Sequence, residues 1–208
     1  MLYKIISSGS SGNAAVYCDN IMVDCGVTRS LLDDYVSKLS IVLLTHEHKD
    51  HFNLTTIKRL EKERPSLRFA CGAHLAEPLK NVRNVDIVEA GTIYNYGSFA
   101  ACPVILYHDV PNFGWRIFYG DKKIFHATDT AHLQGITAKD YDLYCLEANY
   151  DEERVYEVIR EKRLRGEYPH QIGAINSHLS IQQAQNFFLQ NRTEGKGEIV
   201  ILHQSKEF

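Results

Sequence analysis

The amino-acid sequence predicts an α/β protein with two sheet-forming regions. Residues 41–44 form a continuous aliphatic run with β-branched members, which is typical of a central strand covered on both faces. Residues 54–63 and 152–164 instead carry apolar side chains at helical spacing among many charged ones. Strand patterns return over 85–107. A second sheet is therefore expected in the second half of the chain.

Composition limits the class of protein. The 208 residues are 44% hydrophobic and 24% charged, so we expect a single domain, 1–208, with a sizeable core. With 23 basic and 26 acidic residues the formal charge is −3, which gives no global positive field for nucleic acid but leaves a local patch open. We find neither a leader pattern nor an apolar run of roughly 18–20 residues. The five cysteines lack CxxC spacing. We therefore expect a cytoplasmic protein with reduced cysteines.

The chain begins with two short strand patterns, 2–6 and 14–18, joined by the serine- and glycine-rich segment 7–13. Glycines permit tight backbone turns, and hydroxyl and N–H groups in such a segment can hold a phosphate. An ordinary connection between strands explains the same composition. The sequence leaves both interpretations open.

The next strand pattern, 21–26, includes a carboxylate at Asp24. Residues 28–39 then carry apolar side chains at helical spacing, and Thr28 is of the type that caps a helix N-terminus. A second short helix is expected over 73–80.

The strand 41–44 leads directly into a segment with metal-ligand chemistry. His46 and His48 are two apart, so in extended backbone both side chains point the same way and can reach one ion. Asp50 and His51 follow where the chain turns towards the next helix. Imidazole and carboxylate at this density suit Zn²⁺, Mn²⁺ or Fe²⁺, and the arrangement offers two adjacent positions about 3.5–4 Å apart.

Further polar residues follow predicted strands in the second half of the chain. The segment Ser177-His178-Leu179-Ser180 precedes another amphipathic helix. Three other histidines, His74, His126 and His132, receive no ligand role. The residues that follow strands are His108 after 99–107, Asp129 after the strand pair 115–119 and 123–127, Glu147 after 142–146, and His203 after 198–202.

The motif His46-x-His48-x-Asp50-His51 resembles the signature of the metallo-β-lactamase-fold hydrolases. The resemblance implies a four-layer αββα sandwich with a dinuclear metal site at one edge, in which Asp24 braces the histidine segment. It implies two divalent ions, Zn or Mn and possibly Fe. The implied ligands are His46, His48 and His108 for the first ion, Asp50, His51 and His203 for the second, and Asp129 as a bridge.

Later segments resemble one bacterial and phage branch of that superfamily, the YycJ/WalJ-like proteins. These are the serine-rich segment near the start, 147–151, 177–180 and 202–207. The resemblance implies a metal-bridging hydroxide that attacks a phosphodiester, 5′→3′ DNA exonuclease activity, and nucleic acid, DNA foremost, as substrate. Besides Asp50, it implies His178 as the general acid, with Glu147 nearby. The chain departs from the branch at Tyr150, where a histidine is usual, and over 163–175.

Two other functions stay open beside the nuclease. A thioester hydrolase of the glyoxalase II type shares the bridging Asp129, and a binding module without metal is the non-enzyme alternative. A true β-lactamase would normally be exported and often has Cys at the position of Asp129. A flavodiiron oxidoreductase would need a carboxylate at His48 and an added flavin domain, and the chain has neither.

Overall fold

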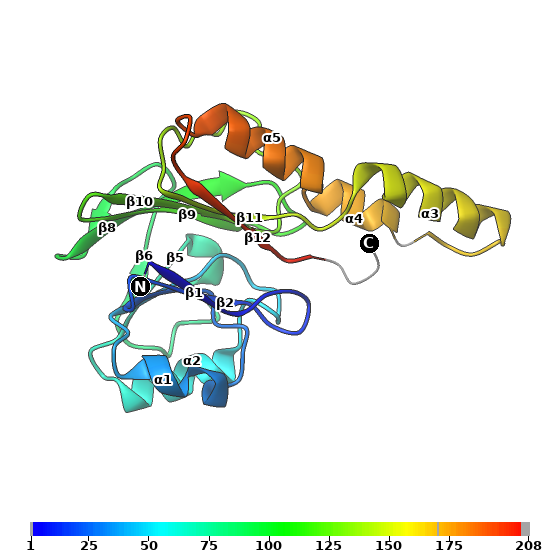
Figure 1. The fold of residues 1–208 in the computed structure, drawn as a ribbon. Helices are drawn as coiled ribbons and strands as arrows, with labels where there is room; N and C mark the ends of the chain where they lie inside the picture. The colour runs from blue at the N-terminus through cyan, green and yellow to red at the C-terminus, as the bar shows by residue number, and fades with distance from the viewer. Residues whose placement is uncertain (1, 170, 205–208) are drawn as a thin grey trace. The chain divides into compact units, whose positions relative to one another are not determined.

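The computed structural model describes residues 2–169 and 171–204 (Figure 1). The chain divides into two compact units, a first unit Met1–Asn95 and a second unit Tyr96–Phe208. Each unit is organised around a mixed sheet. The single domain over 1–208 stays a prediction.

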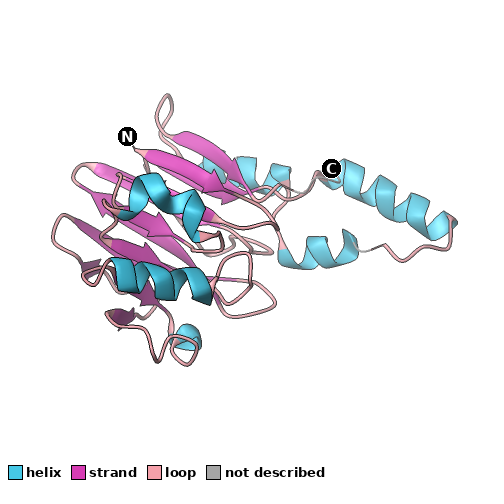
Figure 2. Ribbon diagram, turned by 90° about the horizontal axis from the view of Figure 1, so that it is seen from below, coloured by secondary structure: helices cyan, strands magenta, loops and turns pink. Residues whose placement is uncertain are grey.

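The sheet of the first unit has the strand order β1-β2-β3-β4-β5-β6. The first two pairings are antiparallel and the remaining three are parallel. Parallel neighbours need crossover connections, which here include a 3₁₀ turn and two helices on one face of the sheet (Figures 1 and 2). The elements are β1 (Tyr3–Ser7), β2 (Ala14–Tyr17), β3 (Ile21–Val23), η1 (Arg29–Leu32), α1 (Asp33–Val36), β4 (Ile41–Leu43), α2 (Leu54–Glu63), β5 (Arg68–Cys71), η2 (Ala73–Leu75) and β6 (Val85–Ile87).

Helix α2 fixes the end of the metal-ligand segment. The side chain of Asn53 accepts the backbone N–H of Thr56 at 3.1 Å and so caps the helix where that segment ends. Ile57 and Leu60 are fully buried in the same core as Val42 of β4. The predicted strand 41–44 and helix 54–63 are both confirmed, with β4 one residue shorter.

In the second unit the strands follow the order β12-β11-β10-β9-β8. Strands β8, β9 and β10 are antiparallel neighbours, and β10, β11 and β12 are parallel. The elements are β8 (Phe99–Leu106), β9 (Asn112–Tyr119), β10 (Lys122–Ala127), β11 (Leu143–Glu147), α3 (Glu152–Leu164), α4 (Gln171–Ser177), α5 (Ile181–Asn191) and β12 (Glu198–Leu202). The short strand β7 (Tyr94–Asn95) ends the first unit.

The three helices of the second unit differ in how they pack. Helix α5 covers the sheet, since its Phe187 stacks on Phe125 and its Phe188 meets Tyr144 edge to face. Helices α3 and α4 pack on each other and extend away from the sheet (Figure 1). The arm formed by α3 and α4, Glu152–Leu164 and Gln171–Ser177, therefore presents most of its surface to solvent.

Two predicted helices are shorter than expected. Residues 28–39 contain the 3₁₀ turn η1 and the one-turn helix α1, which are continuous over 29–36. Thr28 occupies the N-cap position without a side-chain capping bond, and its hydroxyl lies 3.1 Å from Ser30 Oγ. Over 73–80 only η2 forms, because Pro78 cannot donate the N–H that a longer helix needs.

Helix α4 was not predicted. Its seven residues include Gly173, which disfavours a helix, and it is held by packing of Ile172 and Ile175 against α3.

None of the helices in the described ranges combines the length and the apolar character that a membrane crossing requires. All five cysteines are free, as expected, and four of them are buried.

Candidate metal centre

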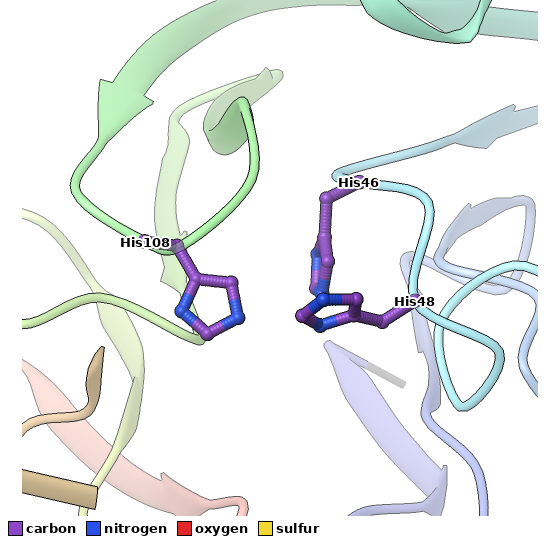
Figure 3. Close-up of side chains that lie close together, drawn as sticks. All are labelled: His46, His48 and His108. Carbon is purple, nitrogen blue, oxygen red and sulfur yellow. The ribbon is translucent and has the colours of Figure 1, made fainter. Parts of the chain in front are cut away.

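The ligand segment of the first unit turns immediately after β4. His46 and His51 are fully buried, and the His46 ring lies 4.7 Å from the His48 ring and 4.3 Å from the His51 ring, centroid to centroid. Figure 3 shows the edge-to-face imidazoles of His46 and His48 leaving this segment, and also draws His108 of the second unit. His46, His48 and His51, which the sequence predicted as neighbouring ligands, therefore lie together.

Asp24 supports this segment as predicted. Its Oδ1 accepts the backbone N–H of Thr45 at 3.0 Å, and its Oδ2 lies 2.6 Å from His51 Nδ1. A carboxylate on Nδ1 fixes the imidazole so that Nε2 carries the lone pair that a metal needs. Asp24 itself has a left-handed backbone with φ of 62°, a conformation that costs a non-glycine residue about 1–3 kcal/mol.

Asp50 lies beside Nε2 of His51. The distance between Asp50 Oδ2 and His51 Nε2 is 3.5 Å, so both atoms can bind one ion. His74, which received no role from the sequence, lies with its Nε2 3.0 Å from the carbonyl oxygen of Thr45 and supports the segment from outside.

The sequence also gave no sign that Asn13 touches this pair. Its amide nitrogen is 3.1 Å from Asp50 Oδ2 and 2.8 Å from His51 Nε2. Local sequence patterns could not predict these contacts, because 37 residues separate Asn13 from Asp50 and 38 separate it from His51.

Strand directions explain why the remaining candidates gather in the second unit. Because β8 and β10 are both antiparallel to β9, they run in the same direction as each other, and β11 and β12 follow β10. The carboxyl ends of these strands thus meet at one edge of the sheet. The residues at or just after these ends are His108, Asp129, Glu147 and His203.

Asp129, Glu147, His178 and His203 form a compact cluster of possible ligands. One side-chain atom from each lies within 4.8 Å of the others. Asp129 Oδ1 is 3.5 Å from both His178 Nδ1 and His203 Nδ1. Asp129 and His203 have positive φ values of 55° and 50°, so both side chains are turned by strained backbone at the strand ends.

Glu147 organises that cluster. It is fully buried, its Oε1 accepts the backbone N–H groups of Thr130 at 2.6 Å and Leu179 at 3.1 Å, and its Oε2 lies 2.9 Å from His178 Nδ1. Burial lowers the pKa of His178, but the hydrogen bond and negative charge of Glu147, with the charge of Asp129, outweigh it and raise the pKa above its usual value. The predicted neighbourhood of Glu147 and His178 is confirmed.

His108 is held by a different contact. Its Nδ1 lies 3.0 Å from the carbonyl oxygen of Ser177, and its Nε2 lies 3.1 Å from Asp109 Oδ1. Burial lowers the pKa of His108, with the charges of Asp129 and Asp109 acting in the opposite sense. A neutral imidazole is the form that binds a metal.

His126 and His132 stay outside the groups of possible ligands that the described residues form. His126 is buried on β10 opposite Trp115, and Tyr150 packs with Val155 and Ile159 of α3. The expectation that His126 and His132 bind no metal stays a prediction.

The donor set fits divalent metal. Each unit brings imidazole nitrogens and carboxylate oxygens together in a largely buried position. In the second unit the buried carboxylates of Asp129 and Glu147 have oxygens within 4.8 Å of each other, and a cation stabilises such a pair. Nitrogen and oxygen donors without thiolate suit Zn²⁺, Mn²⁺ and Fe²⁺. The His/Asp clusters are consistent with a dinuclear site.

Comparisons with known proteins agree with this geometry. The family model described as "Beta-lactamase superfamily domain" matches residues 19–203. No curated protein matches the sequence. The metallo-beta-lactamase fold protein YhfI from Bacillus subtilis has a TM-score of 0.75 at 18% identity, with 98% of this chain and 86% of that chain covered.

Two further solved structures share the fold at lower identity. The short form of human tRNase Z has a TM-score of 0.70 at 16% identity, with 99% of this chain and 93% of that chain covered. A diphosphatase from the PhnP family has a TM-score of 0.65 at 12% identity, with 99% and 87% covered. The predicted metallo-β-lactamase fold, an α/β fold of two mixed sheets with flanking helices, is confirmed. With its buried His/Asp clusters, the chain belongs to the beta-lactamase superfamily domain family of metal-dependent hydrolases.

Proposed function

We propose that the protein is a dinuclear-metal-dependent phosphodiesterase that cleaves nucleic acid, with DNA as the expected polymer. The observation that carries the proposal is the pair His178 and Glu147 beside Asp129. Such a pair can donate a proton, and the sugar alkoxide released from a phosphodiester needs one. A thiolate released from a thioester does not, since thiols have pKa values near 8.5. The pair therefore favours phosphodiesters over the glyoxalase II type of reaction.

The proposed ligands are those that the sequence resemblance implied. His46, His48 and His108 would hold one ion, Asp50, His51 and His203 the other, and Asp129 would bridge them. Support comes from each unit by itself, because the His46–His51 segment and the Asp129–His203 cluster each bring their donor atoms together. When bound, two such ions lower the pKa of water from 15.7 to about 7 and stabilise charge on the phosphate.

The protein side chains have separate tasks in this proposal. Asp24 holds the His51 ring through Nδ1, and Asn149 holds the backbone of His203 by donating to its carbonyl oxygen at 3.0 Å. His178 would protonate the leaving oxygen. Glu147 keeps the His178 ring oriented and favours its protonated form.

The arm supports nucleic acid as the substrate. Arg160, Lys162, Arg163 and Arg165 cluster at the end of α3, where Leu164 is 80% exposed, and Tyr168 beyond it is 72% exposed. Cations bind phosphates and exposed aromatic rings stack on bases. A purely structural explanation also exists, because cations stabilise a helix C-terminus and Arg165 pairs with Glu161.

We further propose that the chain belongs to the YycJ/WalJ-like branch, on the basis of the segments quoted from its sequence. The motif 202–207 extends beyond the described residues at 205–207. The branch histidine is replaced by Tyr150, which packs with Val155 and Ile159 of α3.

A substrate panel tests the proposed reaction. Mn²⁺-loaded protein would be assayed against 5′-phosphorylated duplex DNA, single-stranded DNA, RNA, bis-nitrophenyl phosphate and a glutathione thioester. We expect turnover of DNA and of the small phosphodiester. Turnover of the thioester alone would replace the nuclease by a thioester hydrolase, and no turnover of any substrate by protein that has bound metal would favour the binding module.

A further inference from the structure

The orientation of the Asn13 side chain is fixed within the connection between β1 and β2. Asn13 is 6% exposed, and its Oδ1 accepts the backbone N–H of Gly9 at 2.8 Å. Because only the oxygen of an amide accepts such a bond, the nitrogen must face the opposite way. Nδ2 therefore faces acceptors: the carbonyl oxygens of Gly9 and Asp50, each at 3.1 Å, and two side-chain atoms of the ligand segment.

The backbone around Asn13 is tied to the same segment. Asn13 donates its N–H to the carbonyl oxygen of Asp50 at 2.6 Å and accepts the N–H of Gly26 at 2.9 Å. A Cβ at Gly26 would lie 1.7 Å from the Asp50 carbonyl oxygen, so only glycine permits this approach. Asn13 and Gly26 are thus packed against the turn at Asp50.

The side-chain atoms that Asn13 reaches belong to Asp50 and His51, two of the proposed metal ligands. Nδ2 lies 3.1 Å from Asp50 Oδ2 and 2.8 Å from His51 Nε2. The contact between His51 Nδ1 and Asp24 at 2.6 Å keeps the ring proton on Nδ1, so Nε2 is an acceptor. Asn13 therefore donates to the lone pair with which His51 would bind metal.

The number of N–H groups on the Asn13 amide decides whether its contacts to Asp50 and His51 can be given up when a cation binds. The amide has two N–H groups for four acceptors, and the two carbonyl oxygens of Gly9 and Asp50 are enough to satisfy both. The contacts to His51 Nε2 and Asp50 Oδ2 can therefore be exchanged for a metal ion without leaving the buried amide unsatisfied.

We propose that Asn13 is a positioning residue for the second metal: it holds Asp50 and His51 together and yields both atoms to the incoming cation while staying anchored on the backbone. This rests on the proposed function, because that function assigns Asp50 and His51 to one ion. It assigns the serine-rich connection a role in metal binding that neither of its sequence interpretations included.

Two substitutions at Asn13 test this role, one through the affinity for the second ion and one through the melting temperature with and without metal. Asn13→Ala removes the side-chain anchor, and we expect the dissociation constant of the second ion to rise by about 10–100-fold, the usual effect of losing a group that orients ligands. Asn13→Asp keeps the acceptor for Gly9 but places a carboxylate about 3 Å from Asp50 Oδ2. This variant should melt lower than wild type without metal and show a larger rise in melting temperature on Mn²⁺ addition.

The test is Mn²⁺ titration by calorimetry, with thermal unfolding of the same samples and no activity assay. The second ion is identified as the binding step lost in His203→Ala, and Ser11→Ala, exposed in the same connection, is the matched control. If wild type binds two ions and Asn13→Ala binds them with the same dissociation constants, the positioning role is overturned and the proposed function is not affected. Wild type without any bound Mn²⁺ would overturn it together with the proposed function. If Asn13→Ala does not fold, an Asn13→Asp variant whose melting temperature rises no more than that of wild type overturns the positioning role.

Discussion

One carboxylate, Glu147, connects the candidate general acid His178 to the backbone beside a candidate metal ligand. Its Oε2 lies 2.9 Å from His178 Nδ1, while its Oε1 accepts the N–H of Thr130, the residue after Asp129. Because Glu147 is fully buried at the end of β11, neither partner can move without leaving a buried acceptor unsatisfied. The acid and the metal ligand therefore share one rigid support.

Metal content is the first prediction. Since the seven proposed ligands provide for two ions, the protein loaded with Mn²⁺ or Zn²⁺ and then desalted should hold close to two ions per chain. Elemental analysis against protein concentration gives the ratio. A ratio near zero after loading would remove the enzyme interpretation.

Substitution of His203 should affect metal and activity together. His203 follows β12, lies 3.5 Å from Asp129 Oδ1 and is held through its carbonyl by Asn149. We expect His203→Ala to lose one ion and all measurable turnover. Elemental analysis and the bis-nitrophenyl phosphate assay on the same sample check both effects, and a variant that keeps two ions would show that His203 is not a ligand.

His178→Ala should behave differently. We expect both ions to remain and turnover of DNA to fall by about 10²–10⁴-fold, the usual contribution of a general acid. The deficit should shrink for a nitrophenyl ester, because nitrophenolate leaves without a proton. Glu147→Gln, which keeps the shape but weakens the hydrogen bond to His178, should show a smaller deficit in the same direction. Release of a metal from His178→Ala would reverse the assignments of His178 and His203.

The cations of the arm should set the salt dependence of DNA binding. Replacing Arg160 and Arg163 with Ala should weaken binding and reduce the slope of log K against log salt concentration by about 2 if both contact phosphates. Fluorescence anisotropy over a range of salt concentrations measures both quantities. Replacing Lys58 and Arg59, which are exposed on α2, removes the same charge and is the control. If both double variants bind DNA with the same affinity and the same salt dependence, the cationic cluster of the arm has only a structural role.

Acid stability provides a prediction independent of the site. Burial raises the pKa of Asp142, but the N–H of Lys123 at 2.8 Å and the ammonium of Lys122 at 3.2 Å outweigh it and hold the pKa below its ordinary value of 3.8. A depressed carboxyl pKa stabilises the fold above the unfolded value, and this contribution is lost as pH falls through the folded value. Urea unfolding should therefore show Asp142→Asn less stable than wild type at pH 7, with the difference shrinking below pH 4. A constant difference would contradict this account.

Local pattern was sufficient for much of the fold and for half of the candidate centre. Residues 54–63 and 152–164 form helices with the predicted bounds because apolar spacing and capping act within the helix itself. The His46–His51 segment was identified for the same reason, since its donors are neighbours in sequence. The helices predicted over 28–39 and 73–80 form only in part, the second because Pro78 lacks the N–H donor that a longer helix needs.

Only the tertiary structure decided how distant residues support these donors. Asn13 reaches Asp50 across 37 residues and His51 across 38. No periodicity encodes such contacts, because they depend on which strands become neighbours and on backbone turns such as the left-handed ones at Asp24 and Asp129. The sequence by itself determined which donors the chain carries and where each strand ends. Folding decided which buried groups hold those donors in place, because hydrogen-bond partners are chosen by proximity in space.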